Sequence, residues 1–196
     1  MTRIIAGAAG SLALTVPRSG TRPTSDRVRE AIFSALEARG GLEGLRVLDL
    51  YAGSGALALE AVSRGAVEAV LVEKNAAAAR IARQNAGTVT AAIAKSRRGS
   101  TPGRVTVAVQ AVQPYLRAQP SVPGAGFDVV FIDPPYEQSE EELAEALTAL
   151  VPLLADEASV LVERSSRSPE PAWPAGIALD RRKSYGETTL WWAVPA

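Results

Sequence analysis

Residues 46–57 read Arg-Val-Leu-Asp-Leu-Tyr-Ala-Gly-Ser-Gly-Ala-Leu, an apolar strand that runs into a glycine turn and then a helix. Gly53 and Gly55 permit a tight turn and let a ligand approach the backbone N–H groups at the helix start. The third glycine of the dinucleotide fingerprint is missing, and Asp49 at the strand end would repel a pyrophosphate. This carboxylate could instead accept a hydrogen bond from a ligand ammonium group.

Strand and helix patterns alternate after this unit, which predicts right-handed βαβ units, a parallel sheet and helices on both faces. The last two strands are joined by the short connection 183–187, so we expect an antiparallel hairpin at one edge. The expected strands are 46–50, 67–72, 105–109, 127–132, 158–163, 177–182 and 188–194, and the expected helices are 56–64, 75–86, 112–118 and 139–151.

The segment before residue 46 predicts a separate small element. Residues 3–6 and 12–16 are short β-prone runs around a glycine-rich turn, so we expect a terminal β-hairpin. Thr24 or Ser25 can then cap a helix. Further along the chain, residues 86–103 are small, polar and basic, and we expect a flexible insertion there.

The second strand of the alternating region ends in a carboxylate that suits a nucleoside. Glu73 follows this strand, 24 residues after Asp49, and a carboxylate at that place can bind two ribose hydroxyls. An ammonium group near Asp49, a ribose on Glu73 and an adenine near the third strand together describe S-adenosylmethionine.

The run Asp133-Pro134-Pro135-Tyr136 follows the fourth strand and forms the second chemical motif. Its prolines fix φ and lack N–H donors, so nearby carbonyls can point into a site. The tyrosine can stack on a ring and the aspartate can accept a hydrogen bond from an amine. These residue types are suited to hold an exocyclic amino nitrogen of a nucleobase for methylation.

Composition excludes several other chemistries. The chain has 196 residues, which fits one α/β domain with a short appendage. It contains no histidine and no cysteine, which argues against most zinc sites, Ser-His-Asp triads and thiol nucleophiles. No apolar run approaches the length of a membrane span. Net charge is zero, but residues 1–29 hold five arginines against one acid, and this allows a local basic face.

The two motifs together resemble the class I, S-adenosylmethionine-dependent amino-methyltransferases, which have a Rossmann-like fold. Residues 22–30, Arg-Pro-Thr-Ser-Asp-Arg-Val-Arg-Glu, narrow the resemblance to the bacterial RsmD-like family. Residues 3–7, 51–57 and 185–188 are also similar to that family, so the resemblance covers nearly the whole chain. Those enzymes methylate a guanine N2 in small-subunit (16S) ribosomal RNA.

The resemblance implies roles for named residues. S-adenosyl-L-methionine would be held by Asp49, Gly53, Gly55, Glu73 and Gln110. Gln110 takes a place where the family tends to have Asn or Asp against the adenine. The catalytic residues would be Asp133, Pro134 and Tyr136, with no metal. The RNA-contacting residues would be Arg3, Arg22, Arg27 and Arg29, although an ion pair with Asp26 or Glu30 is an equal alternative for the last two.

The resemblance also implies an organisation and a setting. Residues 1–23 would be an RNA-contacting hairpin extension and residues 24–196 the methyltransferase domain. We expect a cytoplasmic monomer that acts on 16S ribosomal RNA, free or within a small subunit or its assembly intermediate. Two alternatives remain open: an adenine-N6 DNA methyltransferase, because the Asp133–Tyr136 motif serves an adenine amine equally well, and a non-catalytic RNA-binding or ribosome-assembly factor.

Overall fold

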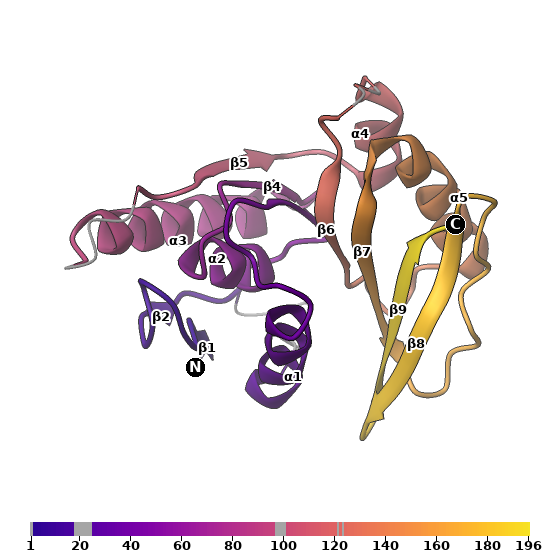
Figure 1. Ribbon diagram of the computed structural model, residues 1–196, viewed down its shortest axis with the longest axis horizontal. Coiled ribbons are helices and arrows are strands. Elements are labelled where there is room, and N and C mark those ends of the chain that lie inside the picture. The colour runs from indigo at the N-terminus through magenta and orange to yellow at the C-terminus, as the bar shows by residue number, and fades with distance from the viewer. Residues whose placement is uncertain (1, 18–24, 97–100, 121, 123) are drawn as a thin grey trace.

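The computed structural model describes residues 2–17, 25–96, 101–120, 122 and 124–196, and it shows a mixed α/β architecture (Figure 1). The predicted fold class is confirmed in its architecture: a Rossmann-like, mostly parallel seven-stranded sheet with an antiparallel edge hairpin, and a small antiparallel hairpin before it. In chain order the elements are β1 (Thr2–Arg3), β2 (Ala13–Leu14), α1 (Asp26–Glu37), β3 (Arg46–Leu50), α2 (Ala56–Ser63), β4 (Glu68–Val72), α3 (Ala76–Ala94), β5 (Arg104–Ala108), α4 (Val112–Ala118), β6 (Phe127–Ile132), α5 (Glu140–Leu150), the 3-10 helix η1 (Val151–Leu153), β7 (Leu154–Ser165), β8 (Ile177–Tyr185) and β9 (Thr188–Pro195).

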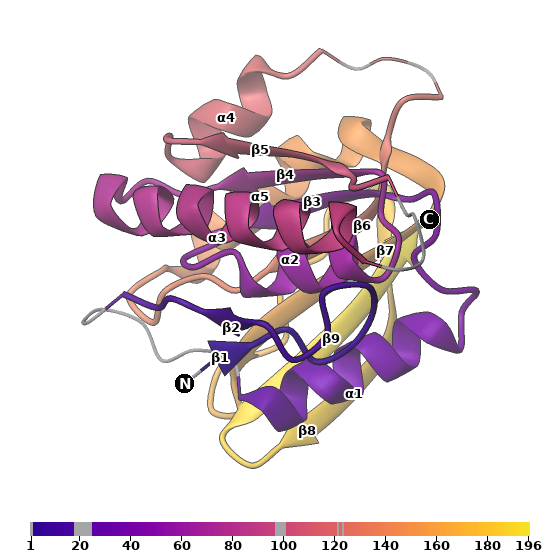
Figure 2. The same cartoon turned by 90° about the vertical axis from the view of Figure 1, so that its left-hand side faces the viewer.

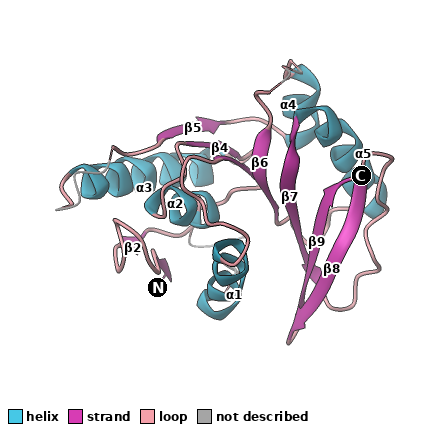
Figure 3. Ribbon diagram, viewed as in Figure 1, coloured by secondary structure: helices cyan, strands magenta, loops and turns pink. Residues whose placement is uncertain are grey.

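The main sheet has seven strands in the order β5-β4-β3-β6-β7-β9-β8 (Figure 3). Strands β5, β4, β3, β6 and β7 are parallel, and β9 is antiparallel to both β7 and β8. The strand order reverses between β3 and β6. Ligands of open α/β sheets bind outside the carboxyl ends of strands at such a reversal, so the fold itself indicates where a site lies.

Two hydrophobic cores lie on opposite faces of the sheet. On one face, α1, α2, α3 and the N-terminal hairpin pack against the sheet, with Phe33 of α1 in a tilted ring contact with Phe131 of β6. On the other face, α4 and α5 pack around residues such as Leu147. Figure 2 shows α1 and the β1–β2 hairpin in front of the sheet, on the first of these faces. Trp191 and Trp192 are adjacent in β9 and are buried in the two different cores.

The N-terminal hairpin is tied to α2 by a buried carboxylate. Glu60 is fully buried and accepts hydrogen bonds from the backbone N–H groups of Ile5 at 2.6 Å and Ala6 at 3.0 Å. Arg64 donates to the same side chain at 2.8 Å. The predicted hairpin is therefore present, with fewer paired residues than expected, and it packs directly against α2 of the main α/β fold.

Several element boundaries differ from the sequence predictions. Helix α3 extends to Ala94, so the flexible insertion predicted over residues 86–103 is wrong for residues 86–94. Val89 and Ile93 explain the difference, because these apolar residues are four apart and are buried against the sheet. Ser25 is the N-cap of α1 and accepts from the N–H of Val28. Within the described ranges, no helix is long and apolar enough to cross a membrane.

Candidate active site

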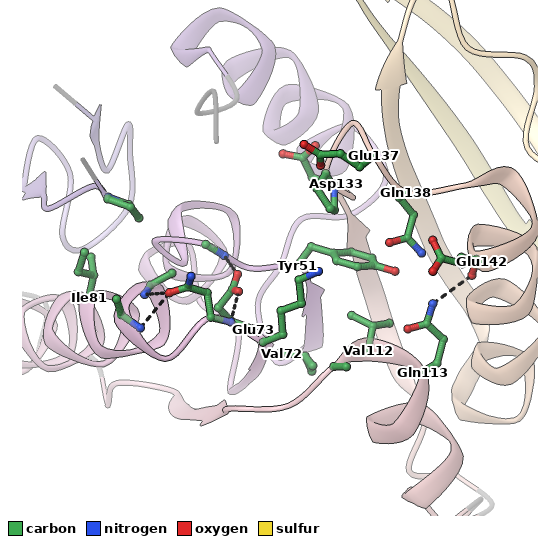
Figure 4. A pocket seen from close by; sticks show the side chains of 18 residues that line it. Tyr51, Val72, Glu73, Ile81, Val112, Gln113, Asp133, Glu137, Gln138 and Glu142 are labelled. Atoms are coloured by element: carbon green, nitrogen blue, oxygen red, sulfur yellow. Dashed lines mark hydrogen bonds between the residues drawn. The ribbon is translucent and has the colours of Figure 1, made fainter. Parts of the chain in front are cut away.

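A cavity of about 590 Å³ opens where β3, β4 and β6 end at the point of strand-order reversal (Figure 4). Segments that follow four strands contribute to its walls, which is the arrangement expected for a ligand site in this class of sheet. Its volume suits a nucleoside-sized ligand. The lining residues include Tyr51, Gly53, Glu73, Ile81, Val112, Gln113, Asp133, Pro135, Gln138 and Glu142.

Glu73 organises the wall after β4. One carboxylate oxygen accepts from the N–H of Gly53 at 2.9 Å, and the other accepts from the N–H of Asn75 at 2.7 Å. A carboxylate has about four lone-pair sites, so acceptor capacity remains on both oxygens. Glu73 therefore fixes the glycine turn to the start of α3 and can still accept from two ligand hydroxyls.

The two glycines of the turn between β3 and α2 are suited to their positions for different reasons. Both Gly53 and Gly55 have positive φ, at 54° and 80°. A Cβ on Gly55 would lie 2.5 Å from Cδ2 of Leu71, so this glycine is needed for the packing of the turn against β4. A Cβ on Gly53 would meet no atom within 4 Å, so Gly53 borders open space that a ligand can approach.

Asp49 lies behind the cavity wall and is only 2% exposed. Its carboxylate accepts from the N–H of Ala58 in the first turn of α2 at 3.2 Å. Burial raises the pKa of Asp49 to about 8, the bond from Ala58 opposes this, and the charges of Asp133 and Glu73 raise the pKa further. Asp49 therefore acts on the cavity mainly through its hydrogen bond to α2, because below pH 8 its buried carboxyl is mostly uncharged.

The predicted catalytic motif is divided between the cavity and the surface. Asp133 and Pro135 line the cavity, and Pro134 is buried behind them. Tyr136 is 75% exposed and does not line the cavity, although its neighbours Pro135 and Glu137 do, so its ring is open to a stacking partner. The same loop therefore presents a carboxylate inside the cavity and an exposed aromatic ring next to the lining residues.

Gln110 does not line the cavity. Its side chain is exposed, and its backbone N–H donates to the carbonyl of Glu73 at 3.2 Å. The next three residues, Ala111, Val112 and Gln113, line the cavity in its place.

The four predicted RNA-contacting arginines lie in different environments. Arg3 and Arg27 are exposed. Arg29 is fully buried and donates to the carbonyl of Arg3 and to Asp26, both at 2.7 Å. Arg29 thus holds α1 against β1. Its ion pair with Asp26 agrees with the alternative to RNA contact that the sequence left open for this residue. Arg22 lies outside the described residues.

Tyr51 and its neighbours form a polar wall that the sequence prediction missed. Figure 4 shows the Tyr51 ring directed toward the group formed by Gln113, Gln138 and Glu142, with Asp133 above the ring. Tyr51 has φ of 65°, a costly conformation for a non-glycine residue. Burial raises its pKa to about 12, with a further increase from Glu142, so the phenol stays protonated at neutral pH.

The donor set fits S-adenosylmethionine. Glu73 can accept from ribose hydroxyls, and the apolar side chains of Ile81 and Val112 can contact an adenine. The charges of Glu73 and Asp133 both raise the pKa of the neighbouring Asp49, and such a negative region favours a cationic ligand.

A family model, curated relatives and solved structures all match nearly the whole chain. The family model described as "Conserved hypothetical protein 95" matches residues 2–194. The Escherichia coli K12 protein "Ribosomal RNA small subunit methyltransferase D" is 36% identical over 94% of this chain and 85% of its own length. The Bacillus subtilis "Putative rRNA methyltransferase YlbH" is 27% identical over 95% of each chain. The solved structure "Putative methyltransferase yhhF from Escherichia coli" superposes with a TM-score of 0.79 at 33% identity, covering 98% of this chain and 96% of that chain.

Proposed function

Since this chain belongs to the RsmD family of methyltransferases, we propose that it transfers the methyl group of S-adenosylmethionine to the N2 amine of a guanine in small-subunit (16S) ribosomal RNA. One observation carries the proposal: Glu73, which suits a ribose, and Asp133, which suits an amine, line the same cavity. The name of the Escherichia coli relative supports ribosomal RNA as the substrate.

The cofactor half of the site comprises Gly53, Glu73, Ile81 and Val112. Glu73 would accept from the ribose, and the open space at Gly53 would admit the ligand to the turn. Asp49 holds the first turn of α2 in place behind it. When bound, S-adenosylmethionine supplies an electrophilic methyl group on a cationic sulfur.

The amine half of the site comprises Asp133, Pro134 and Tyr136. The target guanine would leave its RNA stack and rest on the exposed ring of Tyr136, which can stack on a base. The Asp133 carboxylate and the Pro134 carbonyl would then accept from the two N–H groups of N2. This arrangement favours a more tetrahedral nitrogen and directs its lone pair toward the reacting carbon.

Asp133 has a second task, which is electrostatic. Methylation places positive charge on the amine nitrogen, and a carboxylate held beside that nitrogen stabilises the charge as it develops. The proton can leave after the transfer, when the nitrogen is acidic, so a histidine base is not needed. The absence of histidine from the chain is consistent with this sequence of events.

Transfer of a labelled methyl group tests the proposal. Purified protein and labelled S-adenosylmethionine are incubated in parallel with small ribosomal subunits, free 16S ribosomal RNA and duplex DNA. The proposal predicts label in one of the two RNA-containing samples, and digestion should release N2-methylguanosine. Label only in DNA, as N6-methyl-2′-deoxyadenosine, would support the DNA methyltransferase instead, and no transfer to any sample would support a non-catalytic role.

The setting of the reaction is part of the same proposal. We expect a cytoplasmic monomer that binds the RNA directly, either free or in a small subunit or its assembly intermediate. Comparison of the first two samples identifies the substrate form, and the mass of the protein in solution reports the oligomeric state. A dimer whose dissociation abolished transfer would contradict the monomeric part of this expectation.

A further inference from the structure

Strand β8 carries three consecutive cations at the edge of the main sheet. Arg181, Arg182 and Lys183 are all exposed, and each has its charge over an aromatic ring, at 5.3, 5.2 and 5.1 Å from the ring centre. Cations on an edge strand commonly prevent that strand from pairing with another sheet. The exposure of Arg181, Arg182 and Lys183 therefore does not by itself indicate a ligand.

The two faces of the strand separate these cations. Arg181 stacks on Trp192 and Lys183 on Tyr185, and both rings belong to the core covered by α1 and the N-terminal hairpin. Arg182 stacks on Trp191, which lies in the core covered by α4 and α5. Arg181 and Lys183 therefore share a face with the exposed Arg3 and Arg27, whereas Arg182 is on the opposite face.

The strand register connects this face to the catalytic loop. Lys183 pairs with Leu190 of β9, and Leu190 pairs with Glu163 of β7. On the next strand, Ile132 of β6 pairs with Val162, so Asp133 continues the row of Glu163. Three strand spacings of about 4.8 Å place the Lys183 backbone roughly 14 Å from that of Asp133.

The charges of Arg181 and Lys183 are available to a ligand. Asp180 in the same strand forms its ion pair with Arg39 of α1. Among the ion pairs of the described residues, none involves Arg181 or Lys183. Stacking on a ring limits the conformations of each long side chain, which lowers the entropy lost when an anion binds.

We propose that Arg181 and Lys183 bind phosphates of the RNA strand that flanks the target nucleotide, on the face of the sheet that also carries Arg3 and Arg27. This inference rests on the proposed function. Phosphate contacts fix the position of a nucleic acid on a protein without reading its sequence. Such contacts, roughly 14 Å from Asp133 along one row of the sheet, would hold the RNA while one base enters the site.

The test compares the double variant Arg181→Gln/Lys183→Gln with the matched control Arg182→Gln. The control changes a neighbouring exposed cation that also stacks on a tryptophan, on the other face of the same strand. Initial rates of methyl transfer are measured on the RNA substrate that the wild-type protein accepts, at several salt concentrations. KM for S-adenosylmethionine is measured in parallel.

The expected result is a KM for RNA roughly tenfold higher in the double variant at physiological salt, with kcat and the KM for S-adenosylmethionine unchanged. The slope of log(kcat/KM) against log(salt) should become shallower by about 1.4, because each lost phosphate contact removes about 0.7. Arg182→Gln should retain the wild-type KM and slope.

Two results would overturn the inference while the wild-type protein methylates RNA. One is an unchanged KM and slope in the double variant. The other is a slope change of about 0.7 in Arg182→Gln, half that of the double variant, because a general effect of charge would give this for one lost cation. If the wild-type protein transfers no methyl group to RNA, the proposed function fails and this inference fails with it.

Discussion

Glu73 joins the glycine turn, the end of β4 and the start of α3 through a single carboxylate. Glu73→Ala should weaken the binding of S-adenosylmethionine by about 10- to 100-fold, because two backbone N–H groups lose their acceptor and the ribose loses its own. Titration calorimetry measures the affinity. Glu73→Gln retains one acceptor oxygen and should lose less, and an alanine variant with wild-type affinity would contradict the role of Glu73.

The buried Asp49 makes the stability of the protein depend on pH. Burial raises the pKa of Asp49 from the ordinary aspartate value of 3.8 to about 8 in the folded protein. As pH rises from 4 to 8, the unfolded chain releases this proton while the folded protein retains it. The contribution of Asp49 to stability is therefore most favourable at low pH, decreases as pH rises through this range, and levels off above pH 8.

Asp49→Asn should remove this dependence. The unfolding free energy of the variant minus that of the wild type should increase between pH 5 and pH 8 by at least about 1 kcal/mol. Urea unfolding at several pH values measures the difference, in which groups that titrate equally in both proteins cancel. A difference that stayed constant or decreased with pH would show that Asp49 ionises normally in the folded protein.

The sequence allowed prediction of Glu73, Gly53 and Asp133 as site residues because strand ends in a parallel sheet meet at one edge, and all three line the cavity. The family resemblance implied Gln110 as a further cofactor-binding residue, yet its side chain is exposed and does not line the cavity. Spacing along the chain locates the end of a strand, but the backbone conformation after that end decides which side chain faces the cavity. Tyr51 was missed for the same reason, because its positive φ could not be predicted from the residues around it.

At the scale of elements, the N-terminal hairpin depends on α2 for its position. Glu60→Ala should destabilise the protein by about 3 kcal/mol, because it leaves Arg64 partly unpaired and two hairpin N–H groups without an acceptor. Denaturant unfolding measures the loss. Faster hydrogen exchange should appear at Ile5 and Ala6, and unchanged protection at both would contradict the account of hairpin docking.

Helix α3 shows why element boundaries were harder to predict than element types. Residues 86–94 are rich in alanine and threonine, a composition that also suits a loop. Their helical state depends on Val89 and Ile93 being buried against the sheet, and this packing partner is distant in sequence. Arg29 gives a similar lesson, since its partner carbonyl belongs to Arg3, 26 residues earlier in the chain.

At the scale of the whole molecule, the strand order brings together two motifs that are far apart in sequence. Strand β3 lies between β4 and β6, so Glu73 after β4 and Asp133 after β6 reach the same cavity from either side of the glycine turn. This topology was predictable, because the alternation of strands and helices leaves few arrangements for a parallel sheet. In the proposed function, Asp133 serves the amine while the other half of the cavity holds the cofactor.

The most direct test of that claim is a paired measurement on Asp133→Ala. Calorimetry gives the affinity for S-adenosylmethionine, and labelled-methyl transfer to the RNA substrate gives kcat. The account predicts an affinity within severalfold of the wild type and a kcat at least about 100-fold lower, because the acceptor that orients and stabilises the amine is gone. Near-normal turnover by Asp133→Ala would contradict the account.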